Sequence, residues 1–139
     1  MRVILKDLGY SELPHSRDEN DCGVRACEIA FGMGYEEAFE FLARQGRKPG
    51  EGTDLAWLHG ASWNRQPVPG YKLKRADFRR RLRLKRRAWR LQEGVWIVVM
   101  PEHVFTIKDG VIYDTVDYQE LMETLVSEAY QVTHVQSLD

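Results

Sequence analysis

The sequence predicts an α+β protein in which N-terminal helices pack on a C-terminal antiparallel sheet. Apolar residues recur at helical spacing over the first third of the chain, whereas short apolar runs separated by turn residues follow residue 95. The chain has 139 residues, of which 43% are hydrophobic, and this suits one domain with a buried core. We therefore expect residues 1–139 to form a single domain.

Helices are predicted before residue 60. A helix over 20–31 begins at a capping Asn or Asp and ends at the Gly-Met-Gly sequence of 32–34. Residues 35–45 are predicted to form a second helix with an acidic face in water, and residues 53–58 a short third one. The apolar stretch at 2–5 indicates an edge strand or an N-terminal arm.

The C-terminal part predicts strands and one tight hairpin. Asp109-Gly110 is the strongest hairpin signal in the chain because Asp-Gly suits the two central positions of a type I′ turn. Strands are expected over 95–100, 104–108, 111–115 and 130–135, with a short helix over 118–125.

Basic residues are concentrated in one segment. Residues 72–90 contain eleven Lys and Arg and one acid, Asp77, which gives this segment a net charge of +10. Because the whole chain carries −1, the other 120 residues carry −11. Phe78 and Leu82 are four positions apart, which favours a basic helix at about 72–90. The candidate partner-binding residues in it are Arg79, Arg80, Arg81, Arg83, Arg86, Arg87 and Arg90.

Cys22 is the candidate nucleophile. It stands between Asp21 and Gly23 where the first predicted helix begins, and unpaired N–H groups at a helix N-terminus stabilise a thiolate. Cys27 lies more than a turn deeper in the same helix, where a free cysteine is ordinary core. A disulfide between the two would close a very short loop, so both thiols are expected to be reduced.

His103 and Asp114 are the candidate base and orienting carboxylate. The Asp109-Gly110 turn sets Phe105 opposite Asp114 and makes Asp114 a diagonal neighbour of His103, about 7–8 Å away at the backbone. The sheet face that carries them is otherwise apolar, so we expect it to pack against the helix that begins at Cys22. A base held by a carboxylate beside a thiol suits nucleophilic catalysis.

Two sets of residues carry a family resemblance. The first is 20–26 with 29–30 and 32–38, and the second is 94–99 with 103–105 and 109–115. They resemble the nucleophile helix and the His and Asp strands of small papain-like cysteine proteins of the C39-peptidase-like group, many of them phage-encoded. The resemblance implies a cysteine hydrolase with Cys22 as nucleophile, His103 as base and Asp114 as orienter, acting on a peptide or protein substrate without cofactor or metal.

The chain departs from the family's pattern at the oxyanion position. Papain-like enzymes usually place a Gln six residues before the Cys, and this chain has Ser16 there. Loss of one oxyanion donor typically costs about 10²–10³ in rate. Ser16 and Asn20 are the candidate oxyanion residues, with the backbone N–H of Cys22 as a substitute donor.

Other functions are also consistent with the sequence. In one, the same fold is an interaction protein of weak or no activity, and the basic helix at 72–90 binds an acidic host protein or nucleic acid. Zinc binding by Cys22, Cys27, His15 and His103 lacks the usual ligand spacing, so no metal is expected. No apolar run is long enough to cross a bilayer, and we expect a cytoplasmic protein, in the host cytoplasm if phage-encoded, with no membrane partner.

Overall fold

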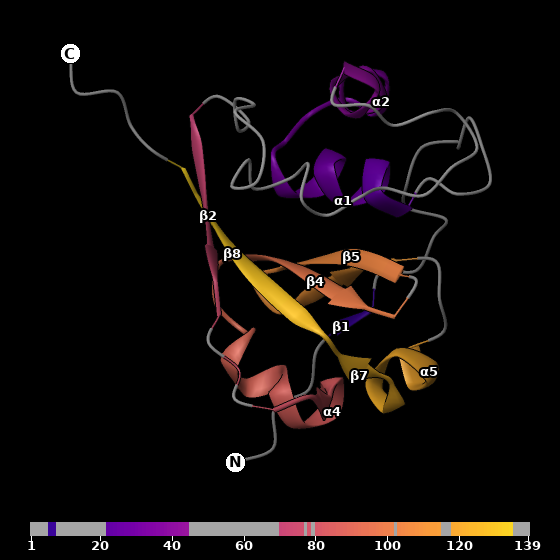
Figure 1. Cartoon of the computed structure of the whole chain (residues 1–139), viewed down its shortest axis with the longest axis vertical. Coiled ribbons are helices and arrows are strands. Elements are labelled where there is room, and N and C mark those ends of the chain that lie inside the picture. Colours follow the sequence, from indigo (N-terminus) through magenta and orange to yellow (C-terminus); the bar gives the residue numbers. More distant parts are fainter. Residues whose placement is uncertain are drawn as a thin grey trace.

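The chain forms a mixed α+β structure built on a six-stranded sheet (Figure 1). The computed structural model describes residues 6–7, 22–44, 70–76, 78, 80–101, 103–114 and 118–134. The sheet order is β1-β6-β5-β4-β8-β2, antiparallel except for the parallel β1–β6 pair, and β3 and β7 form a separate two-stranded sheet. The strands are β1 (Lys6–Asp7), β2 (Tyr71–Arg75), β3 (Leu82–Arg83), β4 (Val95–Met100), β5 (His103–Lys108), β6 (Val111–Tyr113), β7 (Leu125–Val126) and β8 (Glu128–His134). The helices are α1 (Cys22–Ala30), α2 (Tyr35–Arg44), α4 (Leu84–Arg87), the 3₁₀ helix η2 (Ala88–Arg90) and α5 (Tyr118–Glu123).

Helices cover both faces of the large sheet. On one face α1 lies between α2 and the sheet, and a buried apolar cluster joins these helices to alternate residues of β4 such as Ile97 and Val99 (Figure 1). On the other face, α4, η2 and α5 pack on the intervening residues, including Trp96 and Val98. Burial on both faces explains why Val95–Met100 reads as a continuous apolar run rather than as an alternating one.

The hairpin between β5 and β6 has the predicted turn and register. Asp109 and Gly110 both have positive φ, 49° and 80°, as a type I′ turn requires. Lys108 pairs with Val111 and Ile107 with Ile112, as expected from a two-residue loop. The predicted helices over 20–31, 35–45 and 118–125 and the strand over 130–135 are confirmed as α1, α2, α5 and β8. The predicted elements at 2–5 and 53–58 lie outside the described residues.

The prediction of a basic helix at about 72–90 is wrong. Tyr71–Arg75 is strand β2, which pairs with β8, and Leu82–Arg83 pairs with β7. Helical geometry begins at Leu84, and α4 and η2 together extend to Arg90. In β2, Tyr71 and Leu73 are half-buried whereas Lys72 and Lys74 are exposed, which is the two-residue alternation of a strand. The dense positive charge concealed this alternation in the sequence.

The expected packing of the His103 face is also wrong. Phe105 and Ile107 belong to the apolar cluster under α4, η2 and α5, on the opposite face of the sheet from α1. The α1 side of β5 is formed by Val104 and Thr106 instead. Because both faces of β5 are buried, its apolar pattern does not tell which face meets which helix.

Candidate active site

The first residue of α1 is Cys22, and a buried hydrogen bond fixes this helix on the sheet. The Thr106 hydroxyl on β5 donates to the Ala26 carbonyl of α1 across 2.8 Å, and Thr106 is fully buried. Val24 and Cys27 anchor the same helix in the apolar cluster beside it. The position of Cys22 relative to β5 is therefore set by core packing rather than by a surface contact.

The structure brings His103 and Asp114 together at the end of the β5–β6 hairpin. His103 is the first residue of β5, and Asp114 directly follows β6. Their side chains meet with 2.5 Å between His103 Nε2 and Asp114 Oδ2. The Asp114 side chain is 6% exposed and the His103 side chain 20% exposed, so water screens this pair weakly.

His103 interacts with Cys22 as well as with Asp114. Burial lowers the pKa of His103, but hydrogen-bonding and Coulombic interactions with Asp114, and then with Cys22, raise it to about 9. Since Nε2 is occupied by Asp114, Nδ1 is the ring nitrogen left to face the thiol. At neutral pH the imidazole is thus held in its protonated form between a carboxylate and a sulfur, which is the charge state that favours a thiolate.

Cys27 has no such environment. It is completely buried in the α1 cluster, and burial raises the pKa of its thiol to about 12. A thiol that stays protonated is inert as a nucleophile. The two cysteines of α1 therefore differ in reactivity for a physical reason, and Cys22 is the one that reaches solvent, being half-buried.

Phe105 and Thr106 support the site, and the sequence reasoning missed both. The Phe105 ring stacks on His103 with 5.8 Å between centroids and 22° between planes, which limits rotation of the imidazole. Thr106 is a polar residue within the buried stretch of β5. Because a buried hydroxyl requires a hydrogen-bond partner, its presence in this apolar stretch was the signal in the sequence for a bond such as the one to Ala26.

Several predicted site residues fall outside this constellation. Ser16 and Asn20, the candidate oxyanion residues, lie outside the described residues, as do His15 and Arg79. The six other candidate partner-binding arginines are carried by residues 80–90, around β3, α4 and η2, on the sheet face opposite α1 (Figure 1). Cys22 on α1 and the predicted partner-binding arginines thus lie on opposite sides of the sheet (Figure 1).

Within the ranges that the structure describes, no group of three or more His, Cys, Asp or Glu side chains is placed to hold a metal ion. The helices in those ranges are all too short or too polar to span a membrane. Comparison of the chain with protein-family models, curated proteins and solved structures finds no match. The function is therefore inferred from the geometry around Cys22.

Proposed function

We propose that this protein is a cysteine hydrolase that cleaves an amide, peptide or isopeptide bond. The observation that carries the proposal is the position of His103, which is hydrogen-bonded to Asp114 and whose pKa is raised by interactions with both Asp114 and Cys22. A nucleophile, a base and an orienting group in one chain of contacts is the minimum that covalent acyl transfer needs.

Each group has a defined role in the proposed reaction. The Cys22 thiolate attacks the substrate carbonyl carbon, and the carbonyl electron pair moves onto oxygen. The carbonyl re-forms as the C–N bond breaks, and protonated His103 gives its proton to the leaving amine, which produces a thioester on Cys22. Neutral His103 then takes a proton from water as the water oxygen attacks the thioester carbonyl carbon, and the C–S bond breaks, which releases the carboxylic acid and restores the Cys22 thiolate beside protonated His103. Asp114 keeps the ring oriented and stabilises its charged form throughout.

The start of α1 offers an oxyanion donor for this reaction. N–H groups in the first turn of a helix have no intrahelical acceptor, and the positive end of the dipole favours developing negative charge. The backbone N–H of Cys22 is the donor we assign, and Ser16 and Asn20 remain candidates for the second. One donor fewer than usual would lower the rate about 10²–10³-fold without changing the order of steps.

The resemblance to papain-like proteins of the C39-peptidase-like group supports the proposal. In that resemblance a helix carries the Cys, a strand the His and a further strand the Asp, in this order along the chain. Cys22 begins α1, His103 begins β5 and Asp114 directly follows β6. We accordingly propose a papain-like fold and a peptide or protein substrate.

An activated ester tests the proposal without knowledge of the substrate. With p-nitrophenyl acetate we expect a mass increase of one acetyl group on Cys22, followed by its release and repeated turnover. Cys22→Ala should abolish turnover and His103→Ala should slow it by about 10²–10⁴-fold, because general acid–base catalysis is worth that much. Cys27→Ala is the matched control and should keep the wild-type rate. Acetylation of Cys22 without release, or turnover that survives Cys22→Ala, would contradict a Cys22 hydrolase.

A further inference from the structure

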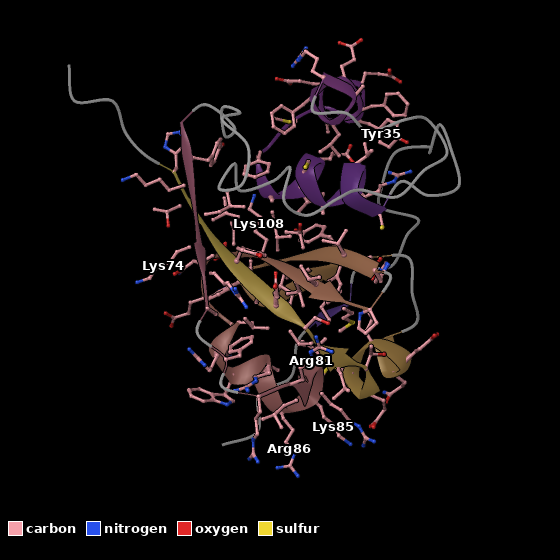
Figure 2. The ribbon with its side chains drawn as sticks, in the orientation of Figure 1. Tyr35, Lys74, Arg81, Lys85, Arg86 and Lys108 are labelled. Carbon is pink, nitrogen blue, oxygen red and sulfur yellow. The ribbon has the colours of Figure 1, made fainter. Side chains whose placement is uncertain are left out.

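A second feature of the molecule lies on the sheet face opposite Cys22. Seven cationic side chains and no acid come from the eleven residues 80–90, which build β3, α4 and η2. They are Arg80, Arg81, Arg83, Lys85, Arg86, Arg87 and Arg90. Lys85 and Arg86 lie at the opposite end of the view from Tyr35 of α2 (Figure 2). We call residues 80–90 the basic surface.

Acidic neighbours neutralise a small part of the basic surface. Arg83 Nη1 and Lys85 Nζ share one carboxylate, that of Glu123, at 3.3 Å and 2.8 Å. All three side chains are roughly half exposed, so these ion pairs contribute little free energy, and another anion can replace the Glu123 carboxylate at small cost. Arg81 and Arg86 are exposed, and within the described ranges neither has a carboxylate at ion-pair distance.

The remaining arginines are held close together by Phe78. The guanidinium groups of Arg87 and Arg90 lie over its ring, with Cζ 4.3 Å and 4.9 Å from the centroid. Arg87 also donates a hydrogen bond of 2.6 Å to the Arg80 carbonyl. Burial first, and then the charges of Arg90 and Arg80, lower the pKa of Arg87, so the cluster carries mutual repulsion that a bound anion would relieve.

Trp89 adds an aromatic face to this charge. Its side chain is 63% exposed, and it lies between Arg86, one helical turn earlier, and Arg90. Base stacking on an exposed aromatic ring, with cations tracking the phosphates, is how proteins bind single strands. The other large exposed apolar side chain in the described part of the chain is Leu125, at 44%. A protein partner would need a wider apolar centre than these two residues offer.

We infer that the basic surface binds single-stranded polynucleotide. Arg80, Arg81 and Arg86 contact successive phosphates, and Trp89 stacks on a base between them. Such a site has low sequence specificity, because phosphate contacts and base stacking are possible with every base. The basic surface shares no residue with the site at Cys22, His103 and Asp114, so the inference is independent of the proposed hydrolase.

Fluorescence anisotropy with labelled oligonucleotides of about a dozen residues tests the inference. Wild-type protein should bind oligothymidylate or oligouridylate, and comparison of the two shows whether DNA or RNA is preferred. Arg81→Gln/Arg86→Gln should weaken binding at least tenfold and make the slope of log affinity against log salt shallower by about 1.4, because each lost single-strand phosphate contact contributes about 0.7. Trp89→Ala should weaken binding about tenfold and leave that slope unchanged.

The matched control removes two positive charges elsewhere in the same basic segment. Lys72→Gln/Lys74→Gln changes exposed positions of β2, and Lys74 lies on the strand and away from Lys85 and Arg86 (Figure 2). This variant should bind like wild type. Equal losses in the two double variants would overturn the inference, as would binding that is tighter for duplex DNA and insensitive to Trp89→Ala. Tighter binding of a polyglutamate peptide would point to an acidic protein partner and would also overturn it.

Discussion

Iodoacetamide near neutral pH is expected to alkylate Cys22 at least about a thousandfold faster than Cys27. The thiolate is the reactive form, and burial that raises the pKa of Cys27 to about 12 leaves almost none of it ionised at pH 7. Cys22 is half-buried at the start of α1 and has protonated His103 beside it. Time-resolved mass spectrometry of the two cysteine-containing peptides gives both rates from one sample.

A variant without the imidazole shows whether Cys22 is alkylated faster than Cys27 for a reason other than its greater exposure to solvent. His103→Ala should lower the Cys22 rate to that of a free cysteine or below, because the positive charge that favours the thiolate is lost. Cys27→Ala is the control and should leave the Cys22 rate unchanged. If Cys22 reacts no faster than free cysteine in the wild type, or equally fast in His103→Ala, Cys22 and His103 do not act together.

Folding stability is expected to decrease by about 3 kcal/mol between pH 6.5 and pH 9 on account of His103 alone. The pKa of His103 is about 9 in the folded protein and returns to 6.5 when unfolding separates it from Asp114 and Cys22. A raised pKa means that the protonated ring stabilises the fold. The contribution is therefore complete below pH 6.5 and is lost as the pH rises through 9. Urea unfolding at a series of pH values measures it.

The pH dependence must be compared with variants because other groups titrate at alkaline pH. In His103→Gln the decrease over this window should be smaller by about 3 kcal/mol than in the wild type. His134→Gln removes an exposed histidine of β8 and should retain the full wild-type dependence. A His103→Gln curve parallel to that of the wild type would show that the imidazole gains no stabilising partner on folding.

Local sequence signals predicted the helices and the hairpin. These features depend only on neighbouring residues, so the sequence specifies them directly. They are the start of α1 at Cys22, its end at the Gly-Met-Gly sequence, and the Asp109-Gly110 turn. The register of β5 on β6 then follows from the turn, and with it the meeting of His103 and Asp114.

Features that depend on long-range packing could not be predicted in this way. The face of β5 that meets α1 is held by contacts between distant parts of the chain, such as the Thr106–Ala26 hydrogen bond between residues 80 positions apart. Tyr71–Arg75 forms a strand because it pairs with β8. The prediction assigned it to a helix because its Lys and Arg residues belong to the same basic segment as the residues around Phe78 and Leu82. The alternation of apolar and polar residues shows which face of a strand is buried when the other face is exposed to solvent. It does not do so in a sheet that is buried on both faces.

The central claim is that His103 connects Asp114 to Cys22, and NMR titration of its Cε1 proton tests this most directly. In the wild type we predict a midpoint at about pH 9. Cys22→Ala should lower the midpoint, and Asp114→Asn should lower it further, because the hydrogen bond to Asp114 is the larger of the two interactions that raise the pKa of His103. A wild-type midpoint near 6.5 that neither substitution moves would contradict the account.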